Sequence, residues 1–490
     1  MKPLHIIENI AKLSFAFLLA LTIQACDSND SDPTPPGIDS STLQVEGGRG
    51  TTVSIPLDLT AEAGIKSLSV TESDGTVIPI SVALGSTSAS LAHEFDIPAE
   101  STLGTVFNLV FTLIDQDDQT TMITAMVTTG KLIDTPATYA FSRNGETSVS
   151  YSGQTDRLNQ LEEIKEYLKL ADAGGVISEQ VLLDMFANTG ENGGGNFSFS
   201  SSKQLKNKTF LPDLDVQLFE DLFARAAAAS IEGSNAIFAT NGTAGLKTRE
   251  NSGATILLDE KGREFTQVIE KGLMGAVFYN QIYNTYLTDD RIGNAVENVA
   301  MSEGKNYTAM EHHWDEAFGY WDPPVDFTSA WPSERASEDR FWSHYSNTID
   351  NVSGGLLGTN DILMTAFKEG RAAIVNNDPA TRDAQRDVLY DAFELVAAGT
   401  AVHYINDTIE FLAEGAQGEA FHVLSEAWAF TNALRYSPRR TMSLEDIETI
   451  METDYGTDGN FWNATVLGLN TAKQKLVSAF PELAPVQDAL

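Results

Sequence analysis

Between residues 41 and 132 the chain alternates apolar and polar residues in short runs. Thr51–Ile55 and Phe107–Ile114 have the period of half-buried strands. The segments Gly47-Gly48, Glu72–Gly75 and Asp115–Asp118 are typical of turns between such strands. This pattern predicts a small antiparallel β-sandwich of immunoglobulin-like type. No motif in it indicates chemistry, so we interpret it as a spacer or adhesion module.

The period of the apolar residues becomes helical beyond about residue 137. Leu158, Leu161, Ile164 and Leu168 recur at helical spacing, and Asp156 precedes them as a cap. Comparable stretches predict helices at about 178–187, 213–231, 261–287, 307–320, 360–376, 380–414, 417–435 and 458–480. The fold class is therefore predicted to be mainly α, with a C-terminal helix bundle over residues 137–490.

Three blocks of this helical region recur in the same order, which indicates a degenerate duplication. The paired blocks are Ala276–Tyr279 with Ala401–Tyr404, His312–Tyr320 with His422–Phe430, and Phe341-Trp342 with Phe461-Trp462. The spacings differ between the copies, and coincidence of three weak matches is the alternative. A true repeat predicts two related helical units packed about a pseudo-twofold axis.

Each copy carries a His-x-x-x-Glu pattern, His312 to Glu316 and His422 to Glu426. Residues four apart lie on one helix face, so a ring nitrogen and a carboxylate can share a cation. Histidine with carboxylate suits iron, zinc or manganese, and helix bundles build such sites from facing helices. The alternative is a histidine buried in the core and paired with a carboxylate.

We therefore predict one metal site from residues of both copies. The expected ligands are His312, His313, Glu316, His422 and Glu426, and the expected supporting residues are Glu311, Asp315 and His403. The metal is expected to be iron or zinc. The zinc-protease motif His-Glu-x-x-His, the Gly-x-Ser-x-Gly elbow and the phosphate-binding P-loop are not in the sequence.

The first residues have the features of an export signal. An apolar run from Leu13 to Ile23 is too short to span a bilayer. It ends in Ile23-Gln-Ala-Cys26, which resembles a bacterial lipobox, and Cys26 is the only cysteine in the chain. We predict a signal peptide over 1–25, lipidation of Cys26 and a flexible acidic tether over 26–40. The β-sandwich is then expected over 41–132 and the helical domain over 137–490.

The acidic residues after Cys26 resemble signals that place lipoproteins on the outer face of some outer membranes. We expect an outer-membrane lipoprotein at the cell surface, with the periplasmic face as the alternative. The formal net charge of −38 argues against attraction to nucleic acid. The expected partners are the membrane that holds the lipid anchor and an outer-membrane transporter or other envelope protein.

Three segments of the helical region resemble the lipoprotein family known as domain of unknown function 4856. They are Glu270–Asn280, Met310–Tyr320 and Gly370–Ile374, and the likeness extends from about Tyr139 onward. The architecture is also distantly similar to imelysins. Those are iron-regulated envelope proteins with duplicated helical bundles, grouped with metallopeptidases.

The imelysin motif Gly-x-His-x-x-Glu is only partly matched here. His313 and Glu316 supply the His-x-x-Glu part, but Glu311 stands at the glycine position and the second copy has a different spacing. The resemblance implies iron acquisition more than hydrolysis. We expect a non-enzymatic protein that binds iron or an iron-bearing ligand in an uptake pathway. The alternatives are a metal-dependent peptidase using His313 and Glu316, and a scaffold or adhesin for a protein partner.

Overall fold

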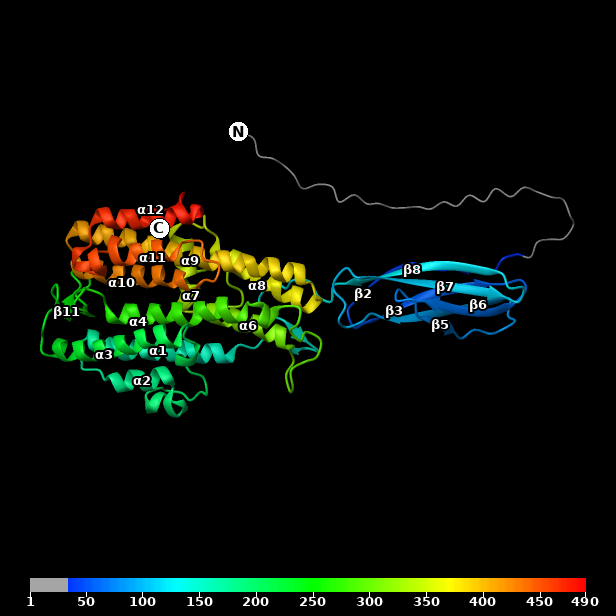
Figure 1. Cartoon of the computed structure of the whole chain (residues 1–490), viewed down its shortest axis with the longest axis horizontal. Coiled ribbons are helices and arrows are strands. Elements are labelled where there is room, and N and C mark those ends of the chain that lie inside the picture. Colours follow the sequence, from blue (N-terminus) through cyan, green and yellow to red (C-terminus); the bar gives the residue numbers. More distant parts are fainter. Residues whose placement is uncertain (1–33) are drawn as a thin grey trace, which may run out of the picture. The chain divides into compact units, whose positions relative to one another are not determined.

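The computed structural model describes residues 34–490, so the predicted signal peptide, Cys26 and the first part of the tether lie outside the described residues. The described chain forms two compact units, one of residues 34–43, 55–93 and 108–125, and one of residues 44–54, 94–107 and 126–490. About 49% of the protein is helical and 17% is strand, with sheets in the N-terminal region and helices after them (Figure 1). The mainly α composition is therefore confirmed.

The N-terminal strands form two sheets. One has the order β1 (Gly37–Asp39), β3 (Thr52–Thr60), β6 (Ser88–Asp96). The other has the order β2 (Gln44–Gly48), β8 (Thr120–Gly130), β7 (Val106–Asp115), β4 (Ile65–Thr71), β5 (Val77–Ile80). Alternate residues of β3 (Val53, Ile55, Leu57 and Leu59) and of β7 (Leu109, Phe111 and Leu113) are buried. This period of two reflects the alternation of side chains across a strand.

The helical region begins where the apolar period changes. Its longer helices are α1 (Ser152–Asp172), α2 (Glu179–Ala187), α3 (Gln217–Ser234), α4 (Phe265–Leu273), α6 (Ala309–Trp321), α7 (Phe341–Val352), α8 (Thr359–Asn376), α9 (Pro379–Glu414), α10 (Gln417–Ala433) and α12 (Val466–Ala479). The wider turns η5 (Met274–Tyr279) and η6 (Ile282–Tyr286) follow α4. Two shorter helices, α5 (Asp289–Ile292) and α11 (Leu444–Thr449), precede α6 and α12 respectively.

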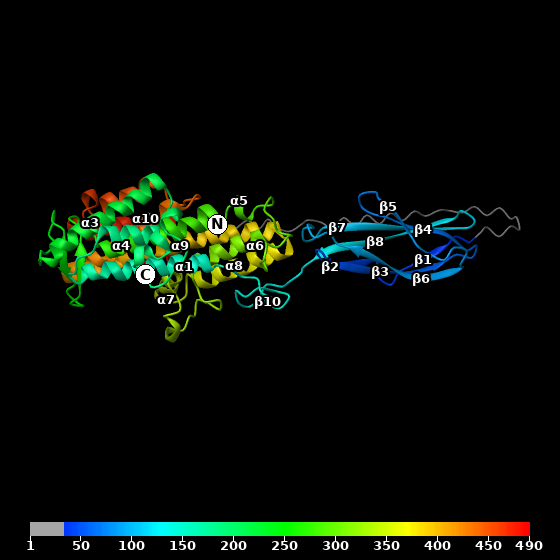
Figure 2. The same cartoon turned by 90° about the horizontal axis from the view of Figure 1, so that it is seen from below.

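Helix α9 is the longest and packs against both α8 and α10, while α4 packs against α1 and α10. The two views of the chain show these helices running roughly side by side (Figures 1 and 2). Trp314, Trp321 and Trp342 are fully buried where the helices meet. These rings bury large apolar areas, and their indole N–H groups find acceptors inside the core.

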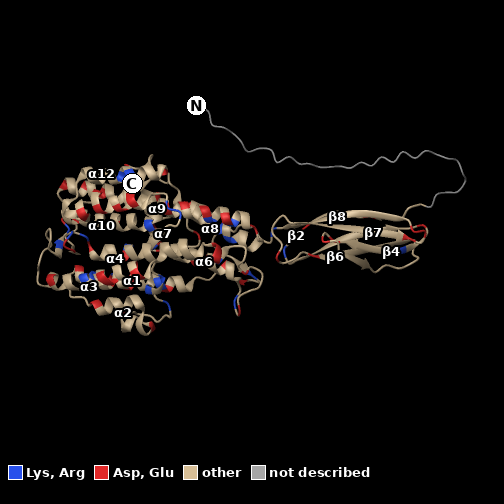
Figure 3. Cartoon of the chain, in the orientation of Figure 1, with Lys and Arg blue, Asp and Glu red and all other residues tan. Residues whose placement is uncertain are grey.

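Three features differ from the expected elements. Helix α7 and the hairpin of β11 (Gly245–Thr248) with β12 (Thr255–Leu258) were not predicted. The last helix begins at Val466 and not near residue 458, because Thr465 caps it and two short 3-10 turns precede it. Charged residues lie on most helices, with acidic side chains the more numerous (Figure 3).

Candidate functional site

Helix α6 carries most of the predicted ligands. The Thr308 side chain accepts a hydrogen bond from the Glu311 N–H, and the Glu311 side chain accepts one from the Thr308 N–H. This capping box satisfies two of the free N–H groups at the start of the helix. It fixes where α6 begins and therefore the directions of His312, His313 and Glu316.

The first predicted pair is present as a neighbouring histidine and carboxylate. The Nε2 atom of His312 lies 3.8 Å from Oε1 of Glu316. The Nδ1 atom lies 2.9 Å from the Ser150 carbonyl oxygen. A carbonyl only accepts, so Nδ1 carries the proton and the Nε2 of the neutral ring presents a lone pair. The ring also stacks on Tyr307, and Glu316 accepts a hydrogen bond from Gln154.

His313 points away from this pair because successive helical residues are turned by about 100°. Its Nδ1 atom donates to the Arg291 carbonyl oxygen over 2.7 Å. Its Nε2 atom lies 3.4 Å from Nη1 of Arg291. Burial lowers the pKa of His313, and the acceptor at Nδ1 offsets only part of that effect. A guanidinium beside Nε2 disfavours a metal ion there.

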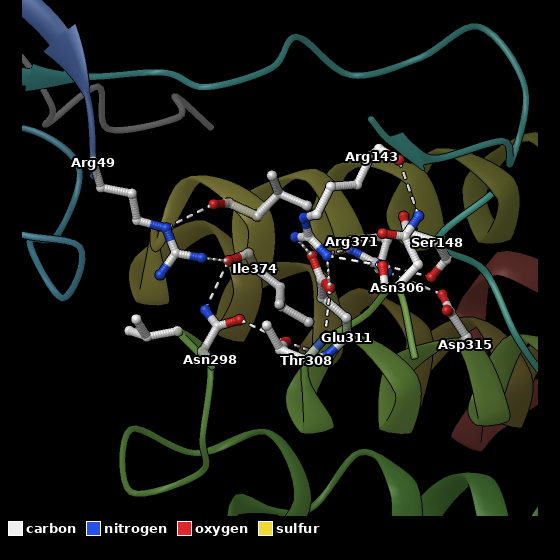
Figure 4. A network of polar contacts seen from close by, with 12 residues as sticks. Arg49, Arg143, Ser148, Asn298, Asn306, Thr308, Glu311, Asp315, Arg371 and Ile374 are labelled. Atoms are coloured by element: carbon white, nitrogen blue, oxygen red, sulfur yellow. Dashed lines mark hydrogen bonds and ion pairs between the residues drawn. The ribbon is translucent and has the colours of Figure 1, made fainter. Parts of the chain in front are cut away.

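Glu311 and Asp315, expected as supporting residues, hold two arginines instead (Figure 4). Glu311 contacts Nη1 of the fully buried Arg371 at 3.1 Å and Nη2 of Arg143 at 2.8 Å. Asp315 accepts from Nε of Arg371 at 3.0 Å and from the hydroxyl of Tyr139 at 2.7 Å. Neither carboxylate orients His312 or His313 in the structure.

The charges of this network are balanced inside the protein. Burial raises the pKa of Asp315 to about 6, although Arg371 opposes the effect. Burial also raises the pKa of Glu311, but the contacts with Arg371 and Arg143 outweigh it and leave the pKa below its ordinary value. Removing one partner of a buried pair leaves an uncompensated charge. We therefore interpret this network as structural.

The second predicted pair lies on α10. The Nε2 atom of His422 is 3.5 Å from Oε1 of Glu426, and its Nδ1 atom is 2.6 Å from Oε2 of Glu264. Burial lowers the pKa of His422, but the two carboxylates outweigh burial and raise it overall. Because Glu264 and Glu426 face opposite nitrogens of one ring, their oxygens do not converge on a single position.

His403 lies on the neighbouring helix α9. Its Nε2 atom is 3.7 Å from Oδ2 of Asp407, one turn further along. Burial raises the pKa of Asp407, and Glu426 contributes to the same shift. His403 thus belongs to the surroundings of the second pair.

The structure does not assemble the five predicted ligands into one group. Across residues 34–490, no three His, Cys, Asp or Glu side chains come together in an arrangement that could hold a metal ion. The correct part of the expectation is local: each His faces the carboxylate four residues later. The sequence does not specify which helices pack together, and a shared metal site between the two copies stays a prediction.

Several buried partners were not anticipated. Glu264 holds His422, while Glu270 and Lys271 form an ion pair of 2.6 Å inside the helical region. The sequence could have indicated the Glu270–Lys271 pair, because these adjacent opposite charges interrupt the mainly apolar stretch of α4 and η5. Glu264 precedes that helix and carries no comparable signal.

Together these observations define a class: a protein with N-terminal β-sheets and a helical region held by buried ion pairs. Residues 136–480 match the family described as Domain of unknown function (DUF4856), and the chain belongs to it. The motif segments that resembled this family contain Glu270, Lys271, Glu311, Asp315 and Arg371, which form the buried ion pairs. No curated protein and no solved structure matches the chain.

Proposed function

We propose that the protein is an envelope lipoprotein, anchored in the outer membrane through Cys26, that binds iron or an iron-bearing ligand for uptake. One observation carries the proposal. In both copies the histidine Nδ1 is held by an acceptor, and Nε2 faces the carboxylate four residues on. This is the arrangement in which an imidazole is oriented toward a metal ion by its second nitrogen.

The distances of both pairs are compatible with a bridging cation. Two ligands at about 2.1 Å from one ion are separated by about 3 to 4 Å, depending on the angle between them. The separations of 3.8 Å at His312 and 3.5 Å at His422 fall in that range. At His312, the Nε2 lone pair of the neutral ring and the Glu316 carboxylate otherwise face each other, which favours a cation or a proton between them. At His422 the two carboxylates raise the pKa of the ring, so a cation there has to compete with a proton.

Two protein ligands leave most of the coordination sphere of iron for other donors. A chelate that brings its own oxygen ligands fits this condition better than a bare ion does. The His312 pair is the more accessible, because the His312 side chain is 30% exposed and that of His422 is 16% exposed. We therefore propose His312 and Glu316 as the first contact for an iron chelate.

The test is calorimetric titration of the purified full chain with ferric citrate, and with Zn²⁺ in a separate experiment. We expect saturable binding of ferric citrate that His312→Ala and Glu316→Gln each weaken at least tenfold. His344→Ala is the matched control, since it leaves both pairs intact. Equal affinity in the wild type and the His312→Ala/His422→Ala double variant would refute the proposal.

We also propose that the N-terminal sheets form an immunoglobulin-like sandwich. The pairing of the first two strands supports this. Strand β1 pairs antiparallel with β3 in one sheet, and the next strand, β2, pairs parallel with β8 in the other sheet. The three-stranded and five-stranded sheets match the two layers of such domains, with β5 as an added edge strand. A spacer between the lipid anchor and the iron site is the role we propose for it.

The helical region is proposed to be a duplicated bundle. The repeated blocks support this because they fall on elements in the same order: η5, α6 and the start of α7 in one copy, and α9, α10 and η11 (Phe461–Asn463) in the other. The two His-x-x-x-Glu pairs then occupy corresponding helices, α6 and α10. Their different acceptors, Ser150 and Glu264, would make the copies unequal in affinity.

A further inference from the structure

A polar pocket lies in the helical region, apart from the residues of the two His–Glu pairs. Its volume is about 300 Å³, and residues of α1, α4, η5 and α7 line it together with the segment before α7. The lining side chains that matter here are Lys165, Glu270, Lys271, Asp339, Arg340 and Phe341. They combine both signs of charge with an aromatic ring.

On one side of the pocket, one carboxylate is shared by two lysines. Glu270 lies 2.6 Å from Nζ of Lys271 and 3.1 Å from Nζ of Lys165. Burial raises the pKa of Glu270, but the two ammonium groups outweigh it and lower the pKa overall. The side chain of Lys165 is 23% exposed, and its ammonium group has three donors. Lys165 also lies 3.5 Å from Glu162, which lines the same pocket, so two carboxylates share its ammonium group and its remaining donor can reach a ligand.

On the other side, Asp339 is a buried carboxylate whose ion-pair partner among residues 34–490 is a histidine, His344, and not a Lys or Arg. Its side chain is fully buried, and Oδ2 accepts a hydrogen bond from Asn347 over 3.0 Å. Its Oδ1 atom has no hydrogen-bond partner among residues 34–490, and no Lys or Arg of that range forms an ion pair with it. The imidazole Nδ1 of His344 lies 3.7 Å from Oδ2. A buried carboxylate oxygen without a hydrogen-bond partner is costly, and a bound ammonium group would compensate Oδ1.

The backbone beside Asp339 is held in an unusual conformation. Phe341, the first residue of α7, has a φ of +49°, which side chains of this size rarely adopt. Arg340 is fixed by Asp322 at 2.9 Å and by Asn159 at 3.0 Å, so the segment is anchored on both sides. Helix α7 starts at the pocket, and the positive end of its dipole favours a negative group there.

We propose that this pocket binds a small zwitterion, namely a free α-amino acid. Its ammonium group donates to Oδ1 of Asp339, and its carboxylate lies against Lys165 and the first turn of α7. The apolar part contacts Phe341 and Met274, which line the same pocket. Its residues belong to neither His–Glu pair, although Tyr345, which also lines the pocket, donates to Oε2 of Glu426 over 3.5 Å.

Calorimetric titration of the full chain with each of the twenty standard L-amino acids tests the proposal. We expect at least one to saturate a single site, with Asp339→Asn and Lys165→Met each weakening it at least tenfold. Asp290→Asn, which removes an exposed carboxylate on α5, should leave the affinity unchanged. For the amino acid that binds, the matching amine without the carboxylate and the matching acid without the ammonium group should both bind more weakly.

Three outcomes would overturn the proposal. The first is a wild-type chain that shows a cooperative thermal unfolding transition but binds none of the twenty amino acids. The second is binding that persists unchanged in both Asp339→Asn and Lys165→Met. The third is Zn²⁺ binding that depends on Asp339 while the amino acids stay inert, because His344 and Asp339 would then be cation ligands. The side chain of Lys165 is partly exposed, so we expect Lys165→Met to fold even if Asp339→Asn does not.

Discussion

At the scale of the residue, the helical region is distinguished by charged side chains that lie inside it. Arg371 is fully buried and is compensated by Glu311 and Asp315, while Lys271 is compensated by Glu270. Burial alone would neutralise such groups, and the paired charges keep them ionised. Asp172, the last residue of α1, is different: it is half-buried and lies close to Glu264, another carboxylate.

Asp172 makes stability depend on pH in a predictable direction. Burial, and then the charge of Glu264, raise the pKa of its carboxyl from 3.8 to about 7. Between about pH 4 and 7 the folded protein therefore holds a proton that the unfolded chain has lost. The free energy of unfolding must fall as the pH rises through this window.

The variant Asp172→Asn imitates the protonated group, so its effect should differ between pH 5 and pH 8. At each pH we compare the free energy of unfolding of the variant with that of the wild type. This difference should favour the variant by on the order of 2 kcal/mol more at pH 8 than at pH 5. Urea unfolding at the two pH values measures this, with Asp290→Asn as the control for loss of an exposed carboxylate. The same stability difference at both pH values would contradict the assignment.

At the scale of the element, apolar periodicity predicted the long helices well. The range 380–414 corresponds to α9 and 360–376 to α8, because each has an apolar face with helical period. Helix α7 could not be found in this way, since Ser343, Ser346 and Asp350 are buried on it. Asp350 accepts hydrogen bonds from the N–H groups of Thr359 and Asn360, so polar residues satisfy each other across elements.

The candidate site was predictable from the sequence only where it depends on spacing within one helix. The facing of His422 toward Glu426 follows from helical geometry alone. The acceptor at the other nitrogen, Glu264, lies 158 residues away, and its position depends on tertiary packing. Local spacing therefore identifies the pairs, while the network around each pair needs the structure.

Close approach of α6 and α8 depends on one glycine. A Cβ atom on Gly370 would come within 2.1 Å of the Trp314 ring, whose indole N–H donates to the Phe367 carbonyl oxygen. Alanine normally stabilises a helix relative to glycine. Here we expect Gly370→Ala to lower the free energy of unfolding by about 1–3 kcal/mol, because the packed ring has to move.

Urea unfolding with tryptophan fluorescence measures the effect of Gly370→Ala. The matched control is Gly399→Ala on α9, where the nearest atom to the new Cβ would be the terminal carbon of Ile349 at 3.2 Å. This flexible end can shift, so the control should differ from the wild type by less than about 1 kcal/mol. Equal free energies of unfolding for Gly370→Ala and the wild type would contradict this, because α6 and α8 would then move apart without loss of stability.

At the scale of the whole molecule, the proposed functions depend on where the chain is held. No helix within residues 34–490 is long and apolar enough to cross a membrane. The proposed attachment is Cys26, the only cysteine in the sequence. One acyl chain gives marginal, reversible binding, whereas two or more anchor a protein stably. Acylation at this residue would therefore decide whether the proposed iron site and the proposed amino-acid pocket stay at the envelope.

Metabolic labelling with palmitate in a bacterium that processes lipoproteins tests this attachment. We expect the wild-type chain to be labelled and recovered with the membranes. Cys26→Ser should be unlabelled, because no other thiol exists in the chain, and should no longer fractionate as an acylated protein. Ser28→Ala, two residues further on, should behave as the wild type. Label on Cys26→Ser would place the lipid elsewhere, and an unlabelled wild type would leave the proposed uptake function without its anchor.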